Sequence, residues 1–343
     1  MRAWVIRVVL FAVVVVVTVA AVRLIGEVDW VEVWDALGHL SWWQAPLLLV
    51  LLVVRQTSNS LPLSLYIAGL SPYRAVLNDQ AAFVIGTVAP TPSDLALRTA
   101  MFSSWGIPAA AGVAGALLHK LTFWIARFGV PVVGLAVLLA RGDELGVRLL
   151  DLASIAFAIG LAAVLLLVMR SDRLARNIGR RGGELVGRVR TVDPEAWATS
   201  CADFRVKVAI RFHGGFPRAL AALAGLLAVD VVMLTLCLRF VGIDATEAPF
   251  GVIVAAYAVG YPLSVFPFAG IGLLDAAIIG GVTAYGGHAL EAPAVAALIV
   301  WRVFTLGGPI VLGVASVALW HRSAAGSGTD IRQLIRSRGD GVH

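Results

Sequence analysis

The chain has 343 residues, of which 59% are hydrophobic and only 14% are charged, whereas an ordinary soluble domain is about 25% charged. This composition excludes a water-soluble globular protein. A helix that spans a bilayer needs roughly 20 mostly apolar residues, and the chain holds several such runs. We therefore expect an all-α polytopic membrane protein. The net charge of +6 is then interpreted as a topology signal, and no nucleic-acid partner is expected. The two cysteines cannot form a disulfide framework.

The first elements expected are a span over residues 8–25 and a short helix over residues 28–40. The first run has arginines on both sides and resembles a signal peptide, but its apolar stretch continues through Ile25, which favours an uncleaved span. In the second segment, apolar side chains recur at helical spacing opposite acids. That pattern is typical of a helix that lies in the membrane interface.

A second span is expected over residues 42–70, and two tryptophans at its start suit the interface. Two short arms follow, over about 75–90 and 92–105. A helix of this length reaches only about 22 Å, which is less than the roughly 30 Å hydrocarbon core. A re-entrant hairpin over about 75–105 therefore fits better than two full spans.

The remaining membrane segments repeat this arrangement. Further full spans are expected over residues 108–140, 149–169, 219–241 and 293–320. A second pair of short arms, over residues 249–266 and 271–285, predicts another re-entrant hairpin over about 249–285. The count is about six full spans and two hairpins.

Residues 170–218 carry eleven Arg or Lys against five acids, an excess equal to the net charge of the whole chain. By the positive-inside rule this is a cytoplasmic loop, expected to form two amphipathic helices on the membrane surface. It separates an N-terminal membrane half, residues 1–169, from a C-terminal membrane half, residues 219–320. A basic tail, residues 321–343, completes the chain. With six full spans and two hairpins, the number of membrane crossings is consistent with both termini and the loop lying in the cytoplasm.

This count also makes the two hairpins open to opposite sides, as in an inverted repeat. AAFVIG at residues 81–86 matches AAYAVG at residues 255–260. Each is followed by a break with prolines, a second arm, and a span with one buried cation. This cation is Lys120 after the first hairpin and Arg302 after the second. Inverted repeats with broken helices are typical of alternating-access transporters.

Ionisable groups inside a span cost at least about 2.5 kcal/mol each and often mark a functional site. We expect the substrate-binding residues to be Arg55, Asn59, Asp94, Arg98, Lys120, Asp275 and Arg302. An equally supported interpretation is that the charges only pair with one another and lock the hairpins to the spans. Asp94 would then pair with Arg98 or Lys120, and Asp275 with Arg302.

The break in each hairpin adds to an anion-binding pattern. Thr91, Pro92 and Asp94 form a capping pattern that begins a helix at mid-membrane, and Gly270 and Gly272 precede the second return arm. A helix that begins there points its free amides at the occupant of the site. These helix termini, together with the cations Arg55, Arg98, Lys120 and Arg302, predict a site for an anion, most plausibly a phosphate.

The histidines offer no paired metal spacing. His119, beside Lys120, is interpreted as a core or interface residue rather than a metal ligand or proton relay. No catalytic residue, metal site or cofactor is expected.

Two C-terminal runs, FPFAGIGLLDAAIIGG and LIVWRVFTLGGPIVLG, resemble the signature of the flippase-like, lysylphosphatidylglycerol synthase transmembrane-region family. The matching positions are Pro267, Gly270, Gly272, Asp275, Arg302 and Pro309. The segments APTPSDLALRTAMFSSWGIP and LLHKLTFW resemble the N-terminal half, so the resemblance covers nearly the whole chain. The chain has Asp275 where the family commonly has Glu, and Lys120 where Arg is common.

The resemblance implies transfer of a lipid between leaflets, and no synthase domain is expected after His321. The leading hypothesis is a flippase or scramblase of the bacterial cytoplasmic (inner) membrane that moves a phosphate-bearing lipid. Its partner would be an anionic membrane lipid, a glycolipid or a polyprenyl-phosphate-linked sugar. One alternative is a membrane-embedded enzyme in which Asp94 or Asp275 is the general base, and a transporter is favoured over it. Another is a structural partner that recruits a cell-envelope glycosyltransferase through residues 170–218.

Overall fold

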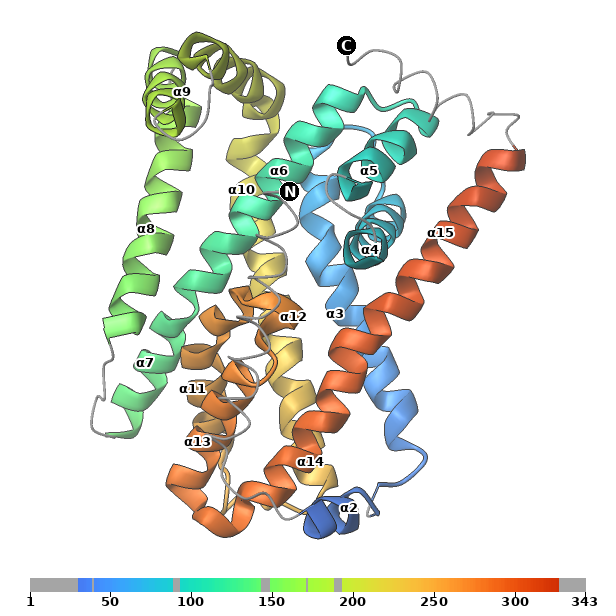
Figure 1. The fold of residues 1–343 in the computed structure, drawn as a ribbon, viewed down its shortest axis with the longest axis vertical. Coiled ribbons are helices and arrows are strands. Elements are labelled where there is room, and N and C mark those ends of the chain that lie inside the picture. Colours follow the sequence, from blue (N-terminus) through green and yellow to red (C-terminus); the bar gives the residue numbers. More distant parts are fainter. Residues whose placement is uncertain are drawn as a thin grey trace, which may run out of the picture. The chain divides into compact units, whose positions relative to one another are not determined.

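A computed structural model describes residues 30–38, 40–88, 93–142, 149–170, 172–187 and 193–326 (Figure 1). All regular structure in these ranges is helical. Five helical segments are long and apolar enough to cross a membrane: Gln44–Tyr66, Ala109–Arg141, Asp151–Val168, Gly214–Phe240 and His288–Ser323. They confirm five of the expected spans and make the protein a polytopic membrane protein. The expected span over residues 8–25 lies outside the described residues.

The helices divide into two compact units. The α4–α5 unit contains Val53–Ala126, Ile159–Leu226 and Gly308–His343. The α11–α13 unit contains Met1–Leu52, Arg127–Ala158 and Leu227–Gly307. The division falls inside four helices, which are α3 (Gln44–Tyr66), α6 (Ala109–Gly129), α8 (Leu149–Arg170) and α10 (Pro194–Phe240).

In the α4–α5 unit, α4 (Pro72–Val88) and α5 (Ser93–Ser104) form a helical hairpin. The two outer ends of the hairpin meet, because the guanidinium carbon of Arg74 lies 5.5 Å from the centre of the Trp105 ring. With 17 residues in α4 and 12 in α5, the arms are about 26 Å and 18 Å long at 1.5 Å per residue. Both are shorter than a full span, as the sequence predicts.

α15 (Gly308–Gly326) packs along α4 in the same unit (Figure 1). Glycine permits this contact, since a Cβ atom on Gly313 would lie 2.6 Å from the carbonyl oxygen of Gln80 and 2.8 Å from Cβ of Val84. The indole Nε1 of Trp320 also donates a hydrogen bond of 3.0 Å to Ser104 Oγ on α5. α15 therefore contacts both arms of the hairpin.

The α11–α13 unit contains the second hairpin. Its first arm is α11 (Phe250–Gly260), continued by a 3-10 turn (Tyr261–Val265), and its second arm is α13 (Leu273–Gly286). A short helix, α12 (Pro267–Gly270), connects the arms. The outer ends meet here too, because a Cβ atom on Gly286 would lie 2.6 Å from the carbonyl oxygen of Glu247.

α7 (Pro131–Arg141) packs along α11 (Figure 1). A Cβ atom on Gly134 would lie 2.9 Å from Cγ2 of Val259, so a glycine permits this contact as well. α14 (Glu291–Arg302) contacts α13 and also α2 (Trp30–Gly38). A helix is thus present as α2 where a short helix was expected. Only part of its apolar face is covered, since Val33 is buried whereas Trp34 is 71% exposed.

The two hairpins exchange the helices that follow them. α6 follows the first hairpin and leads past Pro131 into α7, which packs in the α11–α13 unit. α14 follows the second hairpin and leads through a π-helical turn (Val303–Gly307) into α15, which packs in the α4–α5 unit. Each hairpin is therefore covered by a helix from the other half of the chain.

The basic segment differs from the two separate helices expected. Its first helix is α9 (Asp172–Gly187), but the second is the beginning of α10, which runs for 47 residues through Pro217 into the span. Hydropathy rises after residue 218, but the helix continues across this boundary, so the second basic helix and the span are one element. Arg180 of α9 and Glu195 of α10 form an ion pair of 2.8 Å.

Candidate functional site

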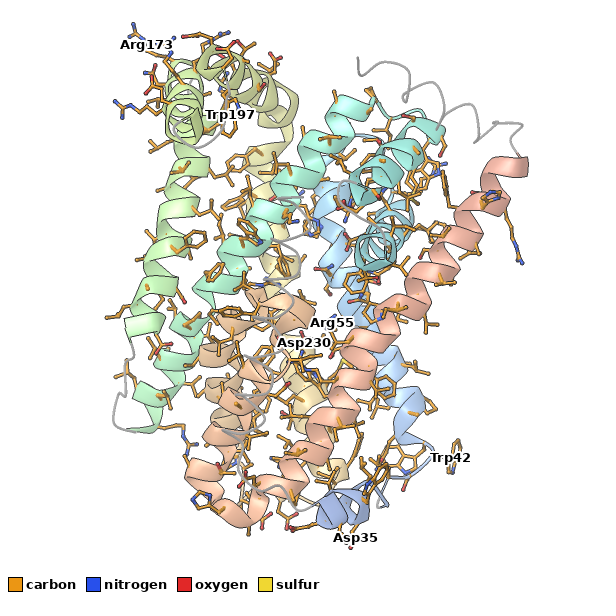
Figure 2. All side chains as sticks on the ribbon, viewed as in Figure 1. Asp35, Trp42, Arg55, Arg173, Trp197 and Asp230 are labelled. Atoms are coloured by element: carbon orange, nitrogen blue, oxygen red, sulfur yellow. The ribbon has the colours of Figure 1, made fainter. Side chains whose placement is uncertain are left out.

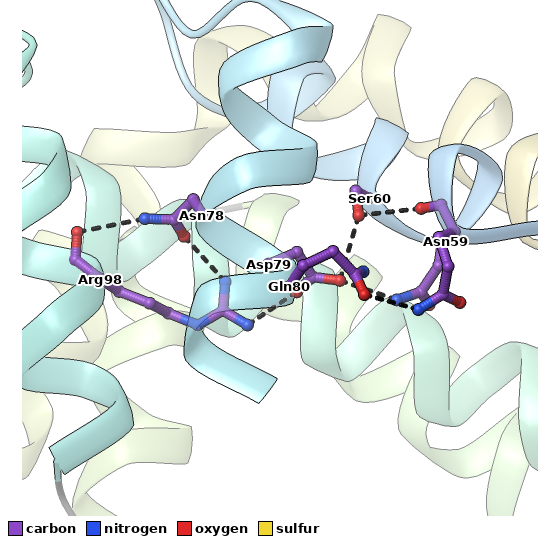
Figure 3. A network of polar contacts seen from close by, with 7 residues as sticks. Asn59, Ser60, Asn78, Asp79, Gln80 and Arg98 are labelled. Atoms are coloured by element: carbon purple, nitrogen blue, oxygen red, sulfur yellow. Dashed lines mark hydrogen bonds and ion pairs between the residues drawn. The ribbon is translucent and has the colours of Figure 1, made fainter. Parts of the chain in front are cut away.

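A polar network in the α4–α5 unit joins α3, α4 and α5 (Figure 3). Its centre is a run of three polar residues, Asn78, Asp79 and Gln80, which interrupts the apolar sequence of α4 and is buried throughout. Burial of polar groups is costly unless they are hydrogen-bonded. The surrounding helices supply the partners, as the contacts of Asp79 show.

Asp79 is the acceptor at the centre of this network. Its Oδ1 lies 2.7 Å from Arg98 Nη2, and the two side chains are only 8% and 17% exposed. Its Oδ2 accepts hydrogen bonds from Asn59 Nδ2 at 2.8 Å and from Ser60 Oγ at 3.2 Å. The Arg98 guanidinium also donates to Asn78 Oδ1 at 2.9 Å. The carboxylate and the guanidinium are thus mutually neutralised inside the unit.

The network continues along α3 to Arg55, a predicted site residue that is labelled in Figure 2. Arg55 Nη1 donates to Gln56 Oε1 at 2.7 Å, and Gln56 Nε2 donates to Gln80 Oε1 at 2.7 Å. The structure thus brings together three of the predicted residues, Arg55, Asn59 and Arg98, and adds two glutamines to them.

Two other predicted residues of this unit stand apart from the network. Asp94 lies in the first turn of α5, and the suggested pairing of Arg98 with Asp94 is wrong, because Arg98 pairs with Asp79. Lys120 of α6 is exposed, and within the described residues no carboxylate forms an ion pair with it. Lys120 is therefore accessible, whereas the Arg98 side chain is only 17% exposed.

His119 precedes Lys120 in α6 and, unlike Lys120, is buried. Its side chain is 7% exposed, and the ring donates a hydrogen bond to the backbone of Asn59 while Asp79 and Arg98 act on it through their charges. Its Nε2 atom is buried and has no hydrogen-bond partner in the described part of the chain.

In the α11–α13 unit, Arg302 pairs with Asp275, as one interpretation of the sequence predicts. Arg302 Nε donates to Asp275 Oδ1 at 2.9 Å, and the side chains are 12% and 13% exposed. Asp275 Oδ2 accepts the backbone N–H of Gly272 at 2.9 Å and so caps α13. Arg302 Nη2 lies 2.8 Å from Oδ1 but is not aligned for a hydrogen bond to any described atom.

The turn before α13 has an unusual backbone that Arg302 stabilises. Ala269, Gly270 and Gly272 have φ angles of +54°, +69° and +83°, a region that non-glycine residues rarely adopt. At residue 270 only glycine fits, because a Cβ atom would collide with the carbonyl group of Leu263. Arg302 Nη1 donates to the Ala269 carbonyl at 3.2 Å, so the arginine joins the strained turn to α14.

Aromatic side chains next to Arg302 form a cluster that the sequence reasoning missed. The Tyr257 hydroxyl donates to Asp230 Oδ2 at 3.0 Å, and its ring lies 5.0 Å from that of Tyr261 and 6.3 Å from that of Trp301, between centroids. Arg127 lies over the Tyr261 ring at 6.0 Å. Tyr257 in the otherwise apolar α11, and Tyr261 directly after that helix, were the available signal for this cluster.

The polar run at residues 78–80 was the corresponding signal in the first hairpin. The residues predicted for the substrate site did not include Asp79. Across the described residues, no group of three or more His, Cys, Asp or Glu side chains is placed to hold a metal ion.

Long apolar helices and charged pairs buried in helical hairpins define a polytopic membrane protein, in which intramembrane charges are commonly functional. The sequence matches the family described as the lysylphosphatidylglycerol synthase TM region over residues 4–313. The chain belongs to this family, which is associated with membrane lipid handling, and the expected resemblance is confirmed. No curated protein gives a significant match.

Proposed function

We propose that the protein is a flippase or scramblase that moves a phosphate-bearing lipid between the leaflets of the bacterial cytoplasmic membrane. The lipid is a phospholipid or glycolipid, or a polyprenyl-phosphate-linked sugar. Membership of a family associated with lipid handling supports this proposal. The observation that carries it is a buried arginine–aspartate pair at each hairpin, Arg98 with Asp79 and Arg302 with Asp275.

The chemistry of these pairs suits reversible binding of a phosphate. A guanidinium binds two oxygens of a carboxylate or of a phosphate with the same fork of N–H groups. An unpaired arginine in a membrane segment would be costly, so the aspartate satisfies the guanidinium while no lipid is bound. A lipid phosphate can replace the aspartate, and the apolar tails of the lipid then need not leave the bilayer.

The proposed architecture is an inverted repeat with two re-entrant hairpins. The chain order α3, α4, α5, α6 and α7 corresponds to α10, α11, α13, α14 and α15. The matching hexapeptides lie in α4 and α11, and the cations Lys120 and Arg302 lie in α6 and α14. The reciprocal exchange of α7 and α15 supports this correspondence. Alternating access is the mechanism such repeats provide.

The proposed orientation places both termini and residues 170–218 in the cytoplasm. The basic α9 supports this orientation, since arginines concentrate in loops that are not translocated. Exposed arginines such as Arg173, labelled in Figure 2, would contact anionic lipid headgroups.

Reconstitution of the purified protein tests the function directly. Vesicles that contain a fluorescent phosphatidylglycerol are treated with a quencher that does not cross membranes, and the loss of inner-leaflet fluorescence measures movement. The wild-type protein should accelerate this loss, and Arg98→Gln should abolish the acceleration. Arg176→Gln, a matched substitution at an exposed ion pair of α9, should remain active.

The recovered lipid separates this proposal from the enzyme hypothesis. A transporter leaves the lipid chemically unchanged, and mass spectrometry after the assay should show this. A chemically altered lipid, or no acceleration with either a phospholipid or a polyprenyl phosphate, would contradict the proposal.

A further inference from the structure

One buried titratable group of the α4–α5 unit has no role in the proposed lipid contacts. The His119 ring donates to the backbone of Asn59, and its Nε2 has no partner in the described part of the chain. The donor is therefore Nδ1, and in the neutral ring Nε2 carries the lone pair. A buried acceptor without a donor is unfavourable, which makes this nitrogen a candidate binding atom.

The corresponding position of the second half shows what is special about His119. Trp301 precedes Arg302 in α14 as His119 precedes Lys120 in α6. Its ring nitrogen is also buried without a hydrogen-bond partner among the described residues. An indole N–H only donates and does not titrate, whereas an imidazole gains a proton between about pH 5 and pH 8. Only the α4–α5 unit can bind a proton at this position.

The charges around His119 determine what a proton there would do. The groups that act on the ring are Asp79 from α4, Arg98 from α5 and Lys120 on its own helix. Asp79 already accepts from Arg98, Asn59 and Ser60. A protonated ring would be a second cation close to the same carboxylate, and it would compete with Arg98 for Asp79.

We propose that His119 Nε2 is a proton-binding site whose occupation loosens the Arg98–Asp79 pair and so couples lipid movement to protons. A hydronium ion gives a proton to the Nε2 lone pair: its O–H bond breaks, the N–H bond forms, a water molecule is released, and the cluster gains one positive charge. Arg98 then becomes available to a lipid phosphate. The link to lipid rests on the proposed function, but proton binding itself does not.

The His119→Asn variant separates proton binding from the hydrogen bond that the ring makes. The asparagine amide can take the place of Nδ1–H and keep the hydrogen bond to the Asn59 backbone, but it cannot bind a proton. The matched control is His321→Asn, at an exposed histidine of α15. Lipid movement is measured in vesicles of phosphatidylcholine and phosphatidylglycerol with the same buffer on both sides, from about pH 5.5 to about pH 8.5.

The wild-type protein and His321→Asn should move lipid at least about three-fold faster at the acidic end, since one proton can change a rate by up to about ten-fold per pH unit. His119→Asn should give the same rate across the range. A wild-type pH profile in His119→Asn would overturn the proposal.

A second measurement keeps the proton site separate from the transport function. The thermal midpoint of the purified protein is measured across the same pH range for the wild type and for His119→Asn. A pH dependence of their difference supports proton binding even if no lipid moves at any pH, an outcome that would overturn the proposed function alone. A difference independent of pH would overturn the proton site.

Discussion

Arg302 combines two tasks, because it neutralises Asp275 and holds the carbonyl of Ala269 in the turn before α13. Asp275 in turn caps α13 through the N–H of Gly272. The pair therefore connects a helix start, a strained turn and the following span. Substitutions can separate its structural role from its role in lipid binding.

Arg302→Ala or Asp275→Ala should each destabilise the protein by about 3–5 kcal/mol, because each leaves one buried charge without a partner. The double variant should regain much of that stability but no lipid movement, since the phosphate-binding cation is gone. Thermal unfolding and the vesicle assay measure the two properties.

Asp275→Asn serves as the control for this series, because it removes the charge but keeps an acceptor oxygen for the Gly272 N–H. If the double Ala variant regained transport together with stability, Arg302 would be only a structural link.

Lys120 allows a cleaner test of a substrate role, because its side chain is exposed and no described carboxylate forms an ion pair with it. Lys120→Ala should change the free energy of unfolding by less than about 0.5 kcal/mol and abolish lipid movement, whereas Lys120→Arg should retain it. Undiminished transport by Lys120→Ala would remove this residue from the site.

Sequence alone identified these charges as exceptional but assigned one partner wrongly. Asp94 is four residues before Arg98 on one helix, which is a favourable spacing. The structure instead pairs Arg98 with Asp79 on the neighbouring arm. The alignment of two arms depends on the turn between them and on packing against α15, and neither can be derived from the spacing of charges within one segment.

At the scale of helices, single glycines decide which helices can approach one another. Gly313 allows α15 to contact α4, and Gly134 allows α7 to contact α11. These contacts form the exchange between the two halves of the chain. They are invisible to hydropathy, which explains why the sequence predicted the spans but not their partners.

Gly313→Ala should destabilise the protein by about 1–3 kcal/mol, because the new methyl group would overlap the α4 backbone. Gly160→Ala in α8 is the matched control, since no atom lies within 4 Å of the added Cβ. The control should be neutral or more stable by about 0.5–1 kcal/mol. Equal melting temperatures for the wild type and Gly313→Ala would contradict the close packing of α15 on α4.

The hairpin arms were predicted from their length alone, and the meeting of their ends supports a re-entrant path. If that path is correct, cysteines at Tyr73 and Pro108 should react with an impermeant reagent from the same side of the membrane. Both positions are exposed and flank the Arg74–Trp105 contact. Labelling from opposite sides would show that residues 72–104 contain an odd number of crossings.

For the whole molecule, topology is the property that the arginine distribution predicts most directly. A cysteine at Arg176 should react only from the cytoplasm, and one at Thr246 only from outside, because acid-rich connectors are the ones expected to be translocated. Modification of both positions from one side of intact cells would refute the proposed orientation.

These experiments require a background without the native cysteines. Burial raises the pKa of the Cys201 thiol. Less of the reactive thiolate is then present and labelling is slow, but slow labelling of Cys201 would still obscure the signal. Cys237 is fully buried. Cys201→Ser and Cys237→Ala remove both thiols. Serine suits the partly exposed position 201, and alanine suits the buried position 237.

The exchange of α15 also has a consequence for the order of synthesis. α4 leaves the ribosome about 220 residues before α15, which is roughly 10–45 s at about 5–20 residues per second. Throughout that interval, the face of α4 formed by Gln80 and Val84 has no α15 to cover it. The nascent first hairpin therefore needs a temporary neighbour, either lipid or an insertion chaperone, until its permanent partner is made.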